Sequence, residues 1–368
     1  MSLRILVVGA GIAGLAAARG LRVAGFRPEV VEALPATMLP SAGIYLPGNA
    51  TRALRQLGLD VPLRPLGDLI FRQVFLDTRG GKLFEMDVAG LWSGVGESRV
   101  LSRADLQQVL LTGVGGGVRF DTEVRDVQIV DGAAKVEFST GGIAEFDLVV
   151  AADGRRSTIR DKVGLGGPAV PTGQIVYRAV VSGGPPVTDW TAVLGRRSQF
   201  VAMPMGGRRL YCHADETAPD APNPADPVER LRELFGSFGG PVPAILDKIE
   251  KVQVARTDEV VLPSWSTGPV VLVGDAAHAT APTLAQGAAM SFEDGWVLGQ
   301  ELRDAAGDIP GALRAWEERR RPRCAEVRER TRERDRTRDV PPALRDPMLR
   351  RRGVSIFTDH YRALVSPV

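Results

Sequence analysis

Near the start of the chain, the spacing of apolar residues changes from that of a strand to that of a helix and back to that of a strand. An apolar run at Arg4–Val8 leads into a Gly-rich turn at Gly9–Gly14, a helical pattern to about Ala24, and a second apolar run at Glu29–Val31. Strand, turn, helix and strand in this order predict a right-handed βαβ unit with two parallel strands.

The later chain shows both helical and strand patterns. Two fully apolar runs, Leu148–Ala152 and Val270–Val273, suit strands buried on both faces of a sheet. Between about residues 166 and 265 the chain is rich in strand patterns and is punctuated by Gly and Pro, which indicates a separate lobe. The other predicted elements are a helix after Pro47, a hairpin at Phe71–Asp87, helices at Arg103–Leu111 and Val228–Phe238, short strands from Val118, and a helix from near Gln286.

Composition is that of an ordinary globular protein. Of 368 residues, 44% are hydrophobic and 24% charged, which argues against a disordered chain. No apolar run approaches the roughly 18 to 20 residues that span a bilayer, so no membrane span is expected. The cysteines, Cys212 and Cys324, lie far apart and predict neither a disulfide framework nor a metal-binding pair, and a cytoplasmic setting is expected.

Arginine is concentrated between Arg314 and Arg352. Acidic residues interleave with it at helical spacing, which predicts a solvated helix with opposite-sign pairs. Binding to nucleic acid is the lesser alternative and is not expected, because no aromatic residues interleave to stack on bases. The interleaved acidic residues are Glu317, Glu318, Glu326, Glu329, Glu333 and Asp335.

The first chemical motif is the turn Gly9-Ala10-Gly11-Ile12-Ala13-Gly14. It follows a predicted strand and opens a helix, and Glu32 stands at the end of the second strand. In such a turn the first glycine permits the tight bend, the second lets the backbone approach a pyrophosphate, and the third allows close packing of helix on strand. The free N–H groups of the helix attract phosphate, and Glu32 can accept hydrogen bonds from a ribose.

Two further motifs each follow a buried strand. The first is Asp153-Gly154-Arg155-Arg156-Ser157 with Arg160, and the second is Gly274-Asp275-Ala276-Ala277-His278 with Pro282 and Gln286-Gly287. Both place a carboxylate and a glycine at the carboxyl end of a strand, where open α/β sheets bind ligands. Taken alone, each could be a simple turn.

Together the three motifs resemble those of the flavoprotein aromatic hydroxylases, the class A monooxygenases with the p-hydroxybenzoate hydroxylase fold. The resemblance covers the chain up to about Arg323. It implies an α/β fold with a Rossmann-like FAD-binding domain of the GR2 type, an inserted and mostly antiparallel β-sheet substrate domain, and a C-terminal helical segment. The expected ranges are 1–70, 98–165 and 266–310 for the FAD domain, 71–97 and 166–265 for the substrate lobe, and 311–368 for the helical region.

The resemblance also implies roles for individual residues. The first turn would bind the ADP part of FAD, Asp153 would serve both FAD and NAD(P)H with Arg160 as a structural partner, Asp275 would hold the ribityl chain, and Arg103 would contact the flavin. The family commonly has Gly-Gln-Gly where this chain has Ala285-Gln286-Gly287. The implied cofactor-binding residues are Gly9, Ala10, Gly11, Ala13, Gly14, Glu32, Arg103, Asp153, Gly154, Gly274, Asp275, Pro282, Gln286, Gly287 and Ala288.

The activity that the resemblance implies is an FAD-dependent monooxygenation that consumes NADPH or NADH. It would hydroxylate or epoxidise a small aromatic substrate with O2, through a flavin C4a-hydroperoxide. The N-terminus of the helix near Gln286–Ala288 would stabilise the reduced flavin electrostatically. The flavin carries the difficult chemistry, so no protein nucleophile is required.

Substrate-orienting candidates come from the β-rich lobe, where Tyr211, Gln199, Tyr177, Arg178 and Met203 are available. The tyrosines could equally be sheet core. His278 could act as a base, but a structural histidine is the favoured reading. With only His213 and His360 besides it, and no clustered cysteine, no metal site is expected.

Two alternatives remain open at the level of sequence. One is a reductase of the same fold; a halogenase is disfavoured because the chain has no Trp-x-Trp. The other is a non-catalytic flavin-binding protein whose basic tail binds a partner. Either a monomer or a homodimer is compatible with the sequence.

Overall fold

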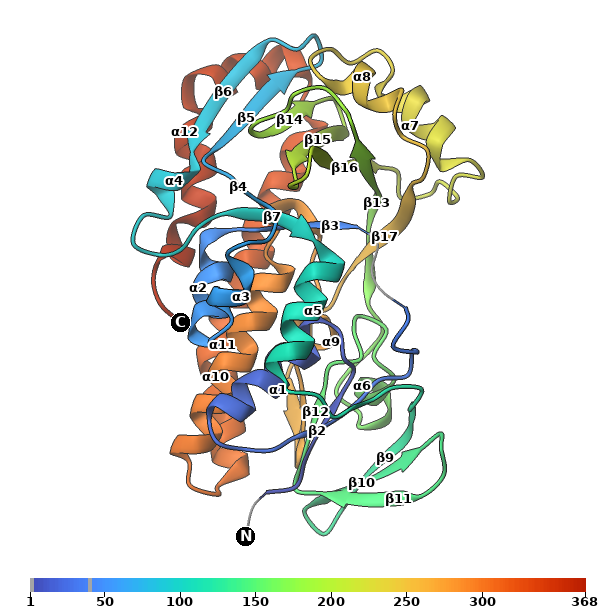
Figure 1. Cartoon of the computed structure of the whole chain (residues 1–368), viewed down its shortest axis with the longest axis vertical. Helices are drawn as coiled ribbons and strands as arrows, with labels where there is room; N and C mark the ends of the chain where they lie inside the picture. The colour runs from blue at the N-terminus through green and yellow to red at the C-terminus, as the bar shows by residue number, and fades with distance from the viewer. Residues whose placement is uncertain (1–2, 39–41) are drawn as a thin grey trace.

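The computed structural model describes residues 3–38 and 42–368, which form two large sheets joined by long helices (Figure 1). The first sheet has six strands, and β1 lies at its centre between β12 and β2, parallel to both. Its strands, in spatial order, are β18 (Ser266–Thr267), β19 (Val270–Leu272), β12 (Leu148–Ala151), β1 (Ile5–Val8), β2 (Glu29–Val31) and β8 (Val118–Arg119). Every residue of β1, β12 and β19 is buried, as expected for strands covered on both faces.

The second sheet has seven strands and is antiparallel except where β14 pairs with β5. Its strands, in spatial order, are β17 (Gln253–Glu259), β13 (Val170–Ser182), β16 (Arg209–Thr217), β15 (Ser198–Pro204), β14 (Trp190–Leu194), β5 (Arg72–Asp77) and β6 (Lys82–Asp87). A separate apolar core packs one face of this sheet against α7 (Pro227–Phe235) and α8 (Val242–Leu246). The other face is therefore free to border a ligand cavity.

Smaller elements complete the chain. Two three-stranded sheets are formed by β3 (Gly43–Leu46), β7 (Arg99–Ser102) and β4 (Asp68–Leu69), and by β11 (Ile143–Phe146), β10 (Ala133–Phe138) and β9 (Val124–Val130). The helices of the first half are α1 (Ile12–Val23), α2 (Gly48–Gln56), α3 (Asp60–Leu63), α4 (Val88–Leu91), α5 (Arg103–Gly113) and α6 (Thr158–Lys162). Those of the second half are α9 (Asp275–His278), η1 (Pro282–Leu284), α10 (Gly287–Asp304), α11 (Ile309–Arg336), η2 (Thr337–Asp339) and α12 (Pro342–Val365).

Helices α1 and α10 touch through their backbones. A Cβ placed on Gly20 would lie 1.9 Å from the carbonyl oxygen of Gly295, and one on Gly295 would lie 2.3 Å from that of Ala16. Neither position can carry a side chain unless the helices separate. This contact fixes the start of α10 relative to the Gly-rich turn that precedes α1.

Elements that the sequence predicts, such as β1, α1, the β5–β6 hairpin, α5 and α7, lie within a few residues of their expected positions, but the Arg-rich segment differs from expectation. It forms α11, η2 and most of α12, and in Figure 1 α11 runs beside α10 toward the seven-stranded sheet. The prediction of a solvated helix was wrong for Arg320, Arg334, Arg338 and Arg345, which are all buried. Long helices that close a core must bury one face, and here that face carries arginines. Three of them, Arg320, Arg338 and Arg345, are held by carboxylate partners.

Within residues 3–38 and 42–368, every helix is too short or too polar to cross a bilayer. The strands of the six-stranded sheet lie between residues 5 and 272, and those of the seven-stranded sheet lie within 72–87 and 170–259. The exact domain ranges given above stay a prediction.

Candidate active site

A cavity of about 380 Å³ connects the two large sheets. Its walls come from the loops that follow β1, β12 and β19, from the start of α10, from the inner face of the seven-stranded sheet, and from α11 and α12. Because parallel strands end at one edge of their sheet, three loops distant in sequence meet here. The predicted residues that line the cavity are Gly11, Ala13, Arg103, Gly154, Asp275, Pro282, Gly287, Ala288, Arg178, Gln199, Met203 and Tyr211.

Each glycine of the first turn has a different steric role. Gly9 has a φ of 102°, and a Cβ there would lie 2.5 Å from the Ala152 carbonyl oxygen. A Cβ on Gly14 would lie 1.8 Å from the Gly9 carbonyl oxygen. A Cβ on Gly11, in contrast, would meet no atom within 4 Å, and Gly11 lines the cavity. The turn is thus closed on the protein side and open on the cavity side, as a pyrophosphate requires.

Glu32 holds this turn in place. One of its carboxylate oxygens accepts a hydrogen bond from the Ala10 N–H at 2.7 Å, and the other accepts one from the Leu34 N–H at 2.9 Å. Each carboxylate oxygen has a second lone pair, so the same group can still accept hydrogen bonds from ribose hydroxyl groups. Glu32 is only partly buried, which leaves room for that contact.

The second loop contains a buried oxygen without a partner. Oδ2 of Asp153 accepts a hydrogen bond from the Ile159 N–H at 3.2 Å, but Oδ1 has no hydrogen-bond partner. The guanidinium of Arg160 donates to the carbonyl oxygens of Ala276 at 3.1 Å and Arg155 at 3.2 Å. Arg160 thereby ties the second loop to the third. An unpaired buried carboxylate oxygen beside a cavity is typical of a site that a ligand completes.

The third loop places Asp275 in the cavity. Gly274 precedes it with a φ of 59°, and a Cβ there would lie 2.4 Å from the Ala13 Cβ. Asp275 lines the cavity and is exposed. Burial and the nearby Arg178 lower the pKa of Arg103, while Tyr211 and Asp275 act in the opposite sense. The open glycine turn, the unpaired oxygen and this free carboxylate together fit a dinucleotide with a polyhydroxyl chain such as FAD.

Gln286 lies outside the cavity lining. Its side-chain oxygen accepts from Nδ2 of Asn49 at 2.8 Å, and its Nε2 donates to Oδ1 of Asn49 at 3.3 Å, so the two buried amides pair with each other. Gln286 can therefore reach a cofactor only through its backbone. Gly287 and Ala288 line the cavity at the start of α10, which has no side-chain cap, so N–H groups of the first turn remain available.

Ala285 has a φ of 54°, in the left-handed region that favours glycine. This is the position where the chain departs from the family's Gly-Gln-Gly. We expect Ala285→Gly to stabilise the protein by about 0.5–1 kcal/mol, because it relieves this strain. Urea denaturation would measure the change. Ala288→Gly serves as the control and should destabilise by a similar amount, since Ala288 is helical. Equal destabilisation by both changes would contradict the assignment of strain to Ala285.

Four of the five substrate candidates face the cavity and one does not. Arg178, Gln199, Met203 and Tyr211 line it, whereas Tyr177 is on the opposite face of β13. The Tyr177 hydroxyl donates to Glu216 at 2.6 Å and its ring packs in the core beneath α7 and α8. Neighbouring residues of a strand face opposite sides, so Arg178 and Tyr177 could not both enter one cavity. Tyr177 is a core residue.

Residues at the distal end of the cavity, away from the three motifs, were not predicted from the sequence. They come from β3, β5, β14, α11 and α12, and no spacing in the sequence links them. Tyr45 accepts a hydrogen bond from Nε2 of Gln73 at 3.3 Å, and burial raises the pKa of its hydroxyl. These distal lining residues are Tyr45, Gln73, Trp190, Arg334 and Tyr361.

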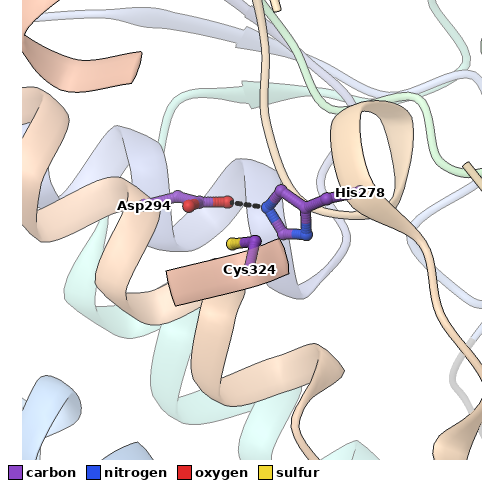
Figure 2. Close-up of side chains that lie close together, drawn as sticks. All are labelled: His278, Asp294 and Cys324. Atoms are coloured by element: carbon purple, nitrogen blue, oxygen red, sulfur yellow. Dashed lines mark hydrogen bonds and ion pairs between the residues drawn. The ribbon is translucent and has the colours of Figure 1, made fainter. Parts of the chain in front are cut away.

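His278 belongs to a buried ion network outside the lining. Figure 2 shows its ring bonded to Asp294, with Cys324 beside both; the nitrogen–oxygen distance is 2.7 Å. Asp294 also accepts from Arg320 at 2.9 Å and from the Gly274 N–H at 2.9 Å. The ligand atoms of His278, Asp294 and Cys324 lie within 4.8 Å of one another, but the Arg320 guanidinium lies 3.6 Å from the Cys324 sulfur and already supplies positive charge. His278 thus has a structural position, fixing the third loop.

Comparison with known proteins adds to this geometry. The profile of a family described as "FAD binding domain" matches residues 2–331. The chain is 29% identical to an FAD-dependent urate hydroxylase of Mycolicibacterium vanbaalenii, over 90% of this chain and 88% of that protein. It is 32% identical to a 3-hydroxybenzoate 6-hydroxylase of Polaromonas naphthalenivorans, over 88% and 85%. The crystal structure of Klebsiella pneumoniae HpxO with FAD and uric acid superposes with a TM-score of 0.90 at 25% identity, covering 99% of this chain and 97% of that one.

Proposed function

Because the chain belongs to the FAD binding domain family and is an FAD-dependent monooxygenase of class A, we propose that it oxidises NADPH or NADH and hydroxylates a small aromatic compound. The observation that supports this most is that one continuous cavity runs from the Gly-rich turn to a wall of aromatic side chains. A dinucleotide and a planar substrate would meet inside it. The non-catalytic alternative loses its basis, since the relatives are enzymes.

The loops provide the groups that would hold FAD. The open backbone at Gly11 and the first N–H groups of α1 would bind the pyrophosphate, and Glu32 the ribose. Asp275 would bind the ribityl hydroxyl groups, and Arg103 with the start of α10 would border the ring. When bound, FAD supplies the hydride acceptor and the centre that activates O2.

The residues of the seven-stranded sheet would orient the substrate. Burial raises the pKa of Tyr211, against the opposing effect of Arg178 and Arg103, so its hydroxyl stays protonated and can donate a hydrogen bond. Met203 and Val201 provide apolar wall on the same face. An enclosed, partly apolar wall excludes water from the reacting atoms and holds the ring in one orientation.

Turnover with candidate substrates tests this proposal. The FAD-loaded protein would be mixed in air with NADH or NADPH and a panel of hydroxybenzoates, phenols and purines, since the relatives are named for urate and 3-hydroxybenzoate. We expect at least one compound to accelerate nicotinamide oxidation and to gain one oxygen atom, as measured by mass spectrometry. A bound flavin that neither nicotinamide reduces, with any compound present, would contradict the proposal.

A further inference from the structure

Arg334, near the end of α11, is a buried cation at the distal end of the cavity. Its exposed fraction is 6%, and its side chain forms part of the cavity lining. The guanidinium carbon lies 4.2 Å from the centre of the Phe357 ring and 5.8 Å from that of Phe75. Aromatic rings thus cover the guanidinium on the protein side.

This guanidinium has no acidic partner. Throughout residues 3–38 and 42–368, no carboxylate forms an ion pair with Arg334, and its guanidinium donates one long hydrogen bond, 3.4 Å to the Tyr361 hydroxyl. The nearby carboxylates are already used: Arg338 pairs with both Asp215 and Asp335. Arg334 is therefore left with donors that the protein does not satisfy.

Burial of a charge without a counter-ion is unfavourable, and the protein interior normally supplies one. Contact with aromatic faces offsets only a part of that cost. Burial lowers the pKa of Arg334, which is the direction expected for a cation that lacks an anion. The free-energy cost of a buried arginine without a counter-ion is lowest when a bound ligand supplies the anion.

We propose that Arg334 binds the negative charge of the substrate, and that the substrate is an aromatic monoanion whose ring lies against Tyr45, Trp190 and Tyr361. The inference rests on the proposed function and narrows its substrate class. Gln73 lies in the same lining and presents an amide that can bind a polar ring substituent. The planar guanidinium suits a planar anion, either a carboxylate or a charge delocalised over a heterocycle.

Equilibrium binding to the FAD-loaded protein tests this inference without any turnover. Perturbation of the flavin absorbance would be titrated with two pairs of probes at neutral pH: 3-hydroxybenzoate against 3-hydroxybenzamide, and urate against hypoxanthine. In each pair only the first compound is an anion. We expect one anion to bind about tenfold or more tightly than its neutral counterpart. Which pair shows the preference distinguishes a carboxylate from a heterocyclic anion.

Variants identify the residue that causes the preference. Arg334→Met should remove it, Arg334→Lys should retain part of it, and Arg336→Met should leave it unchanged, because Arg336 is exposed and pairs with Glu329. If Arg334→Met does not retain FAD, the comparison of Arg334→Lys with the wild type shows whether Arg334 causes the preference for the anion. Wild-type protein that binds neither anion, or that binds both members of each pair equally, overturns the inference. So does a preference that survives in Arg334→Met or that is lost in Arg178→Met instead.

The two proposals fail separately. If neutral compounds stimulate nicotinamide oxidation and gain oxygen while anions do not bind, the monooxygenase function stands and the role of Arg334 is wrong. If anions bind with the expected preference but no compound is oxygenated, the role of Arg334 stands and the proposed reaction is wrong.

Discussion

Gly11→Asp should strongly weaken FAD binding and leave the protein folded. Gly11 has extended backbone, with φ −75° and ψ −173°, and a Cβ there would touch nothing, so the new side chain fits without strain. Asp is also a favourable N-cap for α1, where Gly11 provides no side-chain cap. The added carboxylate would repel the pyrophosphate and compete for the N–H groups that bind it. We expect FAD affinity to fall roughly 100-fold or more.

The measurement compares FAD content after purification, FAD titration of the apoprotein, and the circular dichroism melting curve. Gly167→Asp is the matched control: Gly167 also has free space around its Cβ, has no positive φ, and lies outside the cavity lining. It should bind FAD like the wild type. Normal FAD affinity in Gly11→Asp would mean that the pyrophosphate is not at this turn.

Asp294→Asn should destabilise the protein by about 3–5 kcal/mol, because it leaves buried cationic partners without their counter-ion. Asp294 is fully buried and its carboxylate binds His278, Arg320 and the Gly274 N–H. Urea denaturation near pH 6 would measure the loss. Asp304→Asn removes an exposed carboxylate paired with Arg303 and should change stability by less than about 0.5 kcal/mol. A similar small effect for Asp294→Asn would show that the network does not stabilise the fold.

The pH dependence gives an independent signature. Burial alone would raise the pKa of Asp294, but His278 and Arg320 outweigh burial and lower it to about 2 from 3.8. Its stabilisation is therefore present above pH 3.8 and is lost as the pH falls through 2. Burial acts to lower the pKa of His278, yet Cys324 and Asp294 raise it well above 6.5, so its contribution is complete below pH 6.5 and is lost at higher pH. The difference between wild type and Asp294→Asn should be largest between about pH 4 and 6.5.

The sequence predicted the three loops and the four substrate candidates that line the cavity, but it did not predict the distal wall. Turns such as Gly9–Gly14 and Gly274-Asp275 are local in sequence, and their backbone requirements appear as glycines at fixed spacing. The strands β1, β12 and β19 were also predicted from their apolar runs, because strands buried on both faces need continuous apolar sequence. The assignment of these loops to FAD atoms stays a prediction that Gly11→Asp tests.

The distal wall of the cavity was missed for a physical reason. Tyr45, Trp190 and Arg334 come together only through tertiary packing, and none belongs to a motif. The burial of Arg334 was not predicted, because it is one of many arginines whose acidic neighbours at helical spacing suggested a solvated face. Burial of single members of a charged helix depends on what packs against it, which the pattern of one helix does not contain. For Tyr177 the error was to predict a cavity residue that is in fact in the core. Tyr177 and Arg178 are adjacent in a strand and therefore face opposite sides of the sheet.

The division of the cavity wall also bears on how such an enzyme can change its substrate. The cofactor end is built from three short loops that tolerate little variation, as the touching backbones of Gly20 and Gly295 illustrate for their supporting helices. The distal end draws single side chains from five separate elements. Substitutions there can accumulate one at a time in evolution, or be randomised together in a directed library, without disturbing the three loops that would hold the cofactor.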